Sequence, residues 1–287
     1  MSAPTLAEVV TVLDELYPPG TAEGWDAVGL VAGDPAREVR KVLFAVDPVA
    51  AVVDEAVEWG ADLLVTHHPL FLKGVHSVAA TTFKGSVVHR LLAAGCALHV
   101  AHTNADAAPR GVADALADLV GLTDRRPLVA RVDDVERGIG RTGRLESATT
   151  LRQFARRVAD VLPVTAQGVR VAGDLDAEVT TAAVVGGSGD SLFDAVRAAS
   201  VDVYVTADLR HHPASELRER AEFEAGGRDA SRGATPYLVD VAHFASEWPW
   251  LAYAAADLAA RLPDGTVTTR VSTLVTDPWS ARIGAER

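Results

Sequence analysis

Val65-Thr66-His67-His68-Pro69-Leu70 closes an apolar run, Ala61 to Val65, that is typical of a buried β-strand. Side chains alternate across a strand, so His67 and His68 are expected to point in different directions at its end. This geometry suits one ligand for each of two neighbouring metal ions better than two ligands for one ion. Pro69 then ends the strand. Adjacent histidines are equally compatible with packing or surface roles, so other stretches must decide.

The segments around this strand alternate between strands and helices. We expect a strand over 39–46, a helix over 49–59, a helix over 83–94, a strand over 96–101 and a helix over 111–120. This alternation predicts parallel β-α-β units. In such sheets, ligand groups gather beyond the carboxyl ends of the strands. His67, His68 and Asp106 all fall at such positions.

The pattern changes near Arg126, which divides the chain into an N-terminal domain over 1–126 and a second domain over 127–287. The second domain is expected to contain a helix over 149–162, strands over 169–172, 181–185 and 237–241, and a helix that starts at Ser246 as N-cap. A gapless shift of 140 residues places Asp62 on Asp202 and Thr66 on Thr206. The fold class is therefore α/β, with two related α/β domains.

Composition sets limits on the partners. The 287 residues carry a net charge of −12 without a basic run, which makes nucleic acid an unlikely partner. The single cysteine, Cys96, excludes an intrachain disulfide. We see no signal peptide and no apolar segment of about 20 residues, so no membrane contact and a cytoplasmic location are expected.

A second pair of candidate ligands lies near the C-terminal end of the second domain. His243 and Glu247 are four residues apart and would share a face on a helix. The full candidate metal-ligand set is His67, His68, Asp106, His243 and Glu247. Imidazoles and carboxylates together suit two divalent ions such as zinc, iron or manganese. Five ligands for two ions leave open positions, as in a reactive site that activates water.

Several motifs in this chain resemble a known family, the Nif-three-like dinuclear metal-centre proteins, also named GTP cyclohydrolase I type 2 homologues. The motifs are Thr66-His67-His68-Pro69-Leu70, Ala101-His102-Thr103-Asn104 with Asp106, His243 with Ser246-Glu247, Gly24-Trp25-Asp26, Gly138-Ile139-Gly140-Arg141, Gly186-Gly187-Ser188-Gly189, and Asp208 with His211-His212. The resemblance implies a Nif-three-like fold with the metal site between the two domains, and a toroidal homohexamer. It also implies two divalent metal ions on the five residues named above.

Other residues keep two interpretations. His102 either orients a ligand or packs, and Asp26 is a candidate for the same supporting role. Packing is favoured over pocket lining for Trp25, and a surface turn over a cavity for His211 and His212. The Gly186 to Gly189 stretch is expected to form a tight turn, because it lacks the lysine of a phosphate-binding P-loop.

Two functions remain open. The first is a metal-dependent hydrolase, in which a two-metal-activated water attacks an unidentified small-molecule substrate and Glu247 acts as the catalytic residue that carries the proton. The second is a non-enzymatic metal-binding assembly or regulatory adaptor. The sequence contains no motif for reading guanine, so the family name does not determine the substrate.

Overall fold

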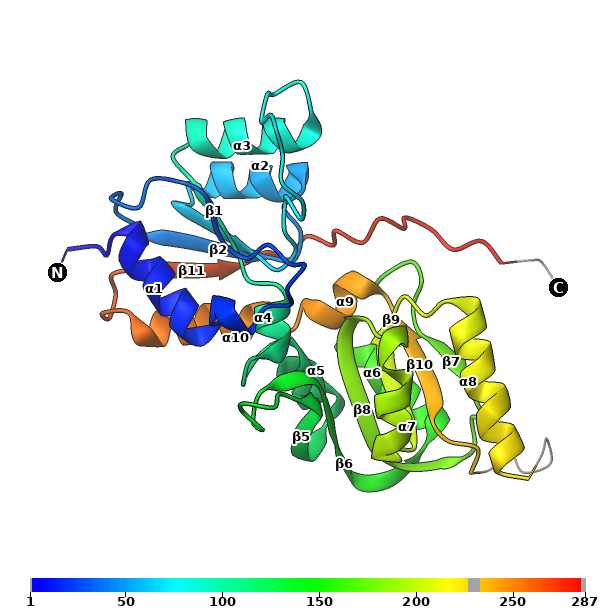
Figure 1. Cartoon of the computed structure of the whole chain (residues 1–287). Helices are drawn as coiled ribbons and strands as arrows, with labels where there is room; N and C mark the ends of the chain where they lie inside the picture. The colour runs from blue at the N-terminus through cyan, green and yellow to red at the C-terminus, as the bar shows by residue number, and fades with distance from the viewer. Residues whose placement is uncertain (1, 227–232, 285–287) are drawn as a thin grey trace. The chain divides into compact units, whose positions relative to one another are not determined.

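A computed structural model describes residues 2–226 and 233–284 of the chain (Figure 1). The chain forms two compact units. Unit 1 combines Met1–Gly111 with Leu251–Thr276, and unit 2 combines Val112–Trp250 with Asp277–Arg287. The sequence-based division at residue 126 differs from these units in two segments. Residues 112–126 belong to unit 2, and residues 251–276 return to unit 1, where they add a helix and an edge strand.

Unit 1 is built on a five-stranded sheet in the order β1-β4-β3-β2-β11. Its strands are β1 (Gly29–Ala32), β2 (Lys41–Ala45), β3 (Leu63–Thr66), β4 (Ala97–Val100) and β11 (Thr268–Val271). All neighbouring pairs are parallel except β1 with β4. The helices are α1 (Leu6–Leu16), α2 (Ala50–Trp59), α3 (Phe83–Ala93), α4 (Thr103–Ala107) and α10 (Trp250–Arg261), with the 3-10 turn η1 (Pro19–Thr21). Figure 1 shows α2 and α3 on one face of the sheet and α1 and α10 on the other.

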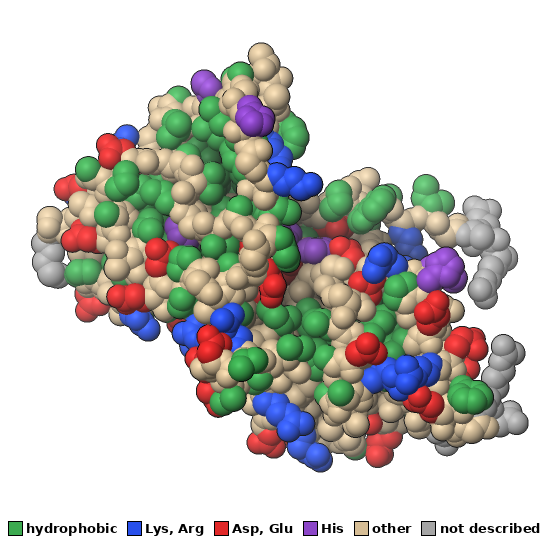
Figure 2. Space-filling view, viewed as in Figure 1, with side chains coloured by type: hydrophobic (Ala, Val, Ile, Leu, Met, Phe, Trp, Pro, Cys, Tyr) green, Lys and Arg blue, Asp and Glu red, His purple; other side chains and the backbone are tan. Residues whose placement is uncertain are grey.

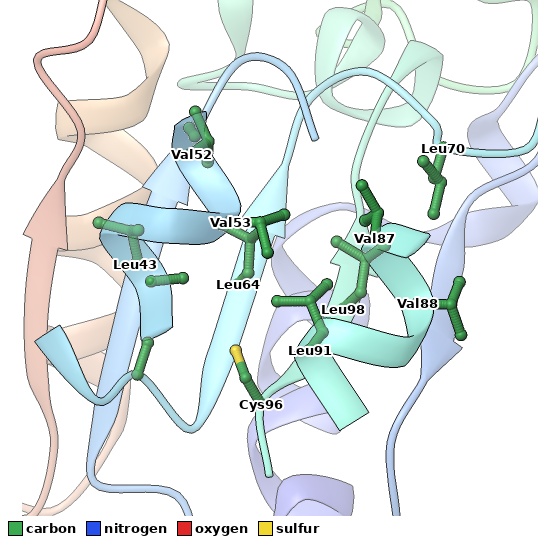
Figure 3. Packing of buried hydrophobic residues seen from close by; sticks show 13 residues of the cluster. Leu43, Val52, Val53, Leu64, Leu70, Val87, Val88, Leu91, Cys96 and Leu98 are labelled. Carbon is green, nitrogen blue, oxygen red and sulfur yellow. The ribbon is translucent and has the colours of Figure 1, made fainter. Parts of the chain in front are cut away.

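Apolar side chains from α2, α3 and the three central strands form one buried cluster in unit 1 (Figure 3). Leu43, Leu64 and Leu98 each come from a different strand and face Val53 of α2 and Leu91 of α3, and all five are fully buried. Fully burying such a side chain contributes about 1.5–3 kcal/mol. Cys96 belongs to this cluster, and burial raises the pKa of its thiol to about 12.

The helix ends in unit 1 follow the sequence signals. Thr5 caps α1, where its side chain accepts a hydrogen bond from the backbone N–H of Glu8, and the Glu8 carboxylate accepts one from the backbone N–H of Thr5. Gly60 ends α2 in the left-handed conformation, which glycine adopts without strain. Local sequence signals thus determine these two helix ends.

Unit 2 is built on a six-stranded sheet in the order β5-β6-β8-β9-β10-β7. Its strands are β5 (Leu122–Ala130), β6 (Gly138–Thr150), β7 (Arg170–Ala172), β8 (Glu178–Ser188), β9 (Val203–Ala207) and β10 (Tyr237–Val241). Only β8, β9 and β10 pair in parallel. The helices are α5 (Val112–Val120), α6 (Leu151–Val161), α7 (Phe193–Ala199), α8 (His211–Glu224) and α9 (His243–Glu247), with the 3-10 turn η2 (Asp190–Leu192).

The strand registers of the two units match at the shift of 140 residues. Val42 of β2 pairs with Leu63 of β3, and Ala182 of β8 pairs with Val203 of β9. The next pair of strands follows the same rule, because Leu63 pairs with Ala97 and Val203 with Tyr237. The short helices α4 and α9 also begin 140 residues apart. Helix α4 follows β4 in unit 1, and α9 follows β10 in unit 2. This common register confirms the prediction of two related α/β halves.

Charged side chains are scattered over the face shown in Figure 2, where red and blue groups alternate without forming a large patch of one sign. This agrees with the dispersed acidity of the sequence. Among the described residues, no helix combines the length and the apolar character that crossing a membrane requires.

Candidate metal centre

The candidate centre in unit 1 starts at the carboxyl end of β3. The backbone N–H groups of His67 and His68 donate to the carbonyl oxygens of Ala45 and Val46 at 3.2 Å and 2.8 Å. These bonds continue the parallel pairing with β2 past the last residue of β3. His67 is completely buried and His68 is half-buried.

Three histidine rings meet at this point. One ring nitrogen from each of His67, His68 and His102 lies within 4.8 Å of the others. The ring centroids of His67 and His68 are 5.2 Å apart, so the two rings do not diverge as simple strand alternation predicts. Both histidines follow Thr66, the last residue of β3, and their rings converge although their backbone N–H groups still pair with the chain that follows β2. Nitrogens at this spacing suit one ion or two adjacent ions, with small side-chain movements.

The rings of His67 and His68 are held by acceptors on their Nδ1 atoms. Nδ1 of His67 lies 3.0 Å from the carbonyl oxygen of Ala101, and Nδ1 of His68 lies 2.7 Å from Oδ1 of Asp47. A carbonyl or an ionised carboxylate only accepts hydrogen bonds, so each Nδ1 carries the proton. The Nε2 atom of each ring then keeps its lone pair for a metal ion, as in the usual support of histidine ligands.

His102 has the same arrangement. Its Nδ1 lies 2.8 Å from Oδ1 of Asp26, whose side chain is fully buried and also accepts hydrogen bonds from the backbone N–H and the hydroxyl of Thr103. Burial opposes ionisation of Asp26, but the hydrogen bonds from His102 and Thr103 outweigh it and lower its pKa. Burial, with the nearby His67, lowers the pKa of His102 and favours the neutral imidazole that binds metals.

Asp106 lies on α4, which starts directly after the loop that follows β4. Its Oδ1 is 3.8 Å from Nε2 of His67, and its side chain is about one-quarter exposed. Asp106 therefore adds a carboxylate oxygen beside the nitrogen that the His67 tautomer leaves available. Unit 1 by itself brings together His67, His68 and Asp106, as the sequence predicts, and adds His102.

The candidate group in unit 2 lies on α9. His243 is the first residue of this helix and Glu247 the last, so the spacing of four places their side chains on one face. Nε2 of His243 is 2.9 Å from Oε1 of Glu247, and Glu247 is almost fully buried. Nδ1 of His243 lies 2.7 Å from Oδ2 of Asp208, which orients the ring as Asp47 orients His68.

The end of β8 approaches α9 closely enough to require glycine. Gly187 has a φ of +68°, and a Cβ atom there would lie 2.6 Å from Oε1 of Glu247 and 3.2 Å from Nε2 of His243. Its backbone N–H donates to Oγ of Ser246, and that hydroxyl donates to the carbonyl oxygen of His243. Ser246 is thus an interior residue of α9, and the prediction that it is an N-cap is wrong.

The remaining histidines lie apart from these groups. His211 and His212 are exposed at the start of α8, and His211 lines a pocket of about 350 Å³ with Arg170 and Asp240. Within the described part of the chain, neither belongs to a set of three donors close enough to hold an ion. His76 and His89 are exposed, and His99 is buried.

Sequence reasoning missed the acceptors that orient the histidines. Asp47 lies two residues past the end of β2, and Asp208 follows β9 directly, so both stand at the carboxyl ends of parallel strands. That position is the signal that could have identified them. Asp26 was only a weak candidate, because nothing in its local sequence connects it to His102, 76 residues away.

Comparisons with known proteins match nearly the whole chain. Residues 4–278 match the sequence profile of the family described as Duf34/NIF3 (NGG1p interacting factor 3). A Streptomyces coelicolor protein named "GTP cyclohydrolase 1 type 2 homolog" is 54% identical over 98% of this chain and 96% of its own length. A Mycobacterium tuberculosis protein of the same name is 36% identical, with 96% of each chain covered.

Solved structures resemble the fold over almost its whole length. A Staphylococcus aureus hypothetical protein has a TM-score of 0.84 at 27% identity and covers 98% of this chain and 100% of its own. A Bacillus cereus protein related to NIF3 has the same TM-score at 23% identity, covers the same shares of the two chains and supports the fold alone.

Proposed function

The chain belongs to the Duf34/NIF3 family, and on that premise we propose that it binds two divalent metal ions and acts as a metal-dependent hydrolase. The proposed ligands are His67, His68 and Asp106 from unit 1 and His243 and Glu247 from unit 2. Zinc, iron or manganese suits this mixture of imidazole and carboxylate donors.

The observation that carries the proposal is the common orientation of the histidine rings. His67, His68 and His243 each present Nδ1 to a carbonyl or carboxylate oxygen within 3.0 Å. Metal-binding histidines almost always have an acceptor of this kind on the nitrogen that does not bind the metal. Acceptors of one kind therefore orient all three imidazoles, and at His67 and His68 they favour the tautomer with the proton on Nδ1.

Two bound ions would supply an activated water and a clamp for a carbonyl or phosphoryl oxygen. The protein's own contribution lies in Glu247 and His243. Glu247 is a buried carboxylate whose Oε1 lies 2.9 Å from Nε2 of His243, which supports it as the proposed group that carries the proton. The named relatives suggest a GTP cyclohydrolase-type reaction, and the substrate is left open.

Metal content per chain tests the site. Protein purified without added metal, the remetallated protein, and the His68→Ala and Glu247→Ala variants would be compared by elemental mass spectrometry. About two ions per wild-type chain, and fewer in both variants, are expected. His76→Ala is the matched control, because His76 is exposed and lies outside the group. If the wild-type protein still contains no metal after remetallation, the proposal is overturned.

Turnover separates a hydrolase from a regulatory adaptor. Glu247→Gln keeps the size of the side chain and removes the proton-accepting carboxylate. If the protein is a hydrolase, the wild type should show metal-dependent turnover of a nucleotide, a phosphoester or a cyclic amide. The Glu247→Gln variant should not. Absence of turnover in the fully metallated wild-type protein would favour the adaptor. We further propose the toroidal homohexamer, which a solution mass of six 30.1 kDa chains would support.

A further inference from the structure

Trp25 lies beside the three-histidine group of unit 1 and remains exposed. Its ring centroid is 6.0 Å from that of His102, with the two planes almost perpendicular at 79°. The residue is 59% exposed, so the packing role expected from the sequence is wrong. Tryptophan is usually highly buried on average, and an exposed indole in contact with a candidate metal ligand therefore needs a reason.

The loop that carries Trp25 is fixed in place. Asp26, the next residue, is held by His102 and Thr103, and the backbone N–H of Glu23 donates to the Thr103 hydroxyl at 2.9 Å. The N–H of Asp26 also donates to the carbonyl oxygen of Glu23 at 2.9 Å. Both sides of Trp25 are thus tied to the start of α4, and the indole is presented without a large cost of ordering on binding.

We propose that Trp25 is a stacking platform for a planar heteroaromatic ring of nucleobase size in the ligand that the metal site acts on. An indole offers a broad, flat apolar surface, and stacking on it tolerates any ring with a π-face. The contact with His102 places the platform one ring away from His67, whose centroid is 5.1 Å from that of His102. The location rests on the proposed function, and the stacking contact itself does not require the ions.

The ring class follows from the shape and charge of the neighbourhood. The carboxylate of Asp26 is turned away from solvent and is satisfied by His102 and Thr103, so it offers no exposed negative charge. Trp25 therefore presents an uncharged aromatic face next to His102. A planar ring covers the face of the indole, whereas a flexible chain covers only part of it.

The experiment compares probes that differ only by the base. Guanosine monophosphate, uridine monophosphate and ribose 5-phosphate are titrated into metal-loaded and metal-free protein containing 5-fluorotryptophan. The fluorine resonance of Trp25 is assigned from its absence in Trp25→Phe. We expect at least one nucleotide to shift the Trp25 resonance and ribose 5-phosphate to leave it unchanged. Unlabelled protein gives the dissociation constants by calorimetry.

Substitutions of Trp25 measure how much the indole contributes to nucleotide affinity. Trp25→Ala should weaken nucleotide binding by roughly 5- to 100-fold, and Trp25→Phe by less, because a smaller ring remains. Phe223→Ala is the control for an exposed aromatic side chain, since Phe223 is 82% exposed on α8 and belongs to neither histidine group. It should bind like the wild type. Ribose 5-phosphate should bind equally to all variants.

The outcomes separate this inference from the proposed function. Base-dependent shifts of Trp25 in protein that binds no metal would sustain the platform and overturn the metal site. Full metal content without any shift of Trp25, or with unchanged nucleotide affinity in Trp25→Ala, would overturn the platform. A Trp25 resonance that changes only with protein concentration would assign the residue to contact with a second copy and also overturn it.

Discussion

Asp62 and Asp202 hold the same structural position in the two units. Oδ2 of Asp62 accepts hydrogen bonds from the backbone N–H groups of Arg40 and Lys41, at 2.8 Å and 2.9 Å. Oδ2 of Asp202 accepts from the N–H groups of Thr180 and Thr181 at the same distances. Each carboxylate thus ties the start of one parallel strand to the next strand. The shift of 140 residues extends to individual hydrogen bonds.

The first prediction concerns Asp202→Asn and its pH dependence. Burial raises the pKa of Asp202, but the hydrogen bonds from Thr180 and Thr181 outweigh it and lower the pKa below the usual value. The stabilisation from the charged carboxylate is therefore present above about pH 4 and is lost as the pH falls through the lowered value. The variant should lose about 1–2 kcal/mol at neutral pH, with the difference shrinking in acid.

Urea unfolding at several pH values measures this difference. Asp264→Asn is the control, because Asp264 lies exposed in the turn before β11. A loss in Asp202→Asn that is the same at pH 3 and pH 7 would show that the carboxylate charge does not stabilise the fold.

The second prediction separates orientation from ligation. Asp208→Ala removes the acceptor on Nδ1 of His243 and leaves His243 and Glu247 in place. Because the ring loses its preferred tautomer and orientation, the apparent metal affinity should fall about 10- to 100-fold. Competition with a fluorescent chelator measures this change. Asp194→Ala, an exposed aspartate on α7, should bind metal like the wild type. Equal affinities in the two variants would assign Asp208 no role in orientation.

A third prediction uses two glycines of similar backbone conformation. Gly187 and Gly168 have φ values of +68° and +63°, but a Cβ at Gly168 meets no atom within 4 Å. Gly168→Ala should cost about 1 kcal/mol of strain. Gly187→Ala adds the collision with Glu247 and should lower both the unfolding free energy and the metal content further. Differential scanning calorimetry and metal analysis compare them, and equal effects would contradict a packing role for Gly187.

The fourth prediction concerns a buried arginine in unit 2. Arg141 is 3% exposed, donates from Nε and one Nη to both carboxylate oxygens of Asp114, and donates from the other Nη to the carbonyl oxygens of Gly138 and Gly140. Arg141→Ala leaves these acceptors in a site shielded from water and should cost about 3–5 kcal/mol.

Arg144→Ala is the control for Arg141, because Arg144 is exposed on the same strand. It should stay within about 0.5 kcal/mol of the wild type in urea unfolding. Similar losses in both variants would show that burial of the guanidinium does not matter.

The sequence predicted the α/β fold because its signals are local. The apolar run before His67, the helix end at Gly60 and the cap at Thr5 all act through neighbours a few residues away. The repeat at 140 residues could be detected in the sequence because Asp62 and Asp202 accept the same backbone hydrogen bonds in the two units. The spacing of four residues between His243 and Glu247 likewise predicted that the two side chains share a helix face.

Tertiary structure alone decided what surrounds these residues. Asp26 reaches His102 across 76 residues, and Trp25 is left exposed because that same loop is pinned to α4. The return of residues 251–276 to unit 1 likewise has no local signal. Local spacing determines which side chains share a strand end or helix face. Contacts between distant segments depend on how complete sheets and helices pack, and no short stretch of sequence encodes that packing.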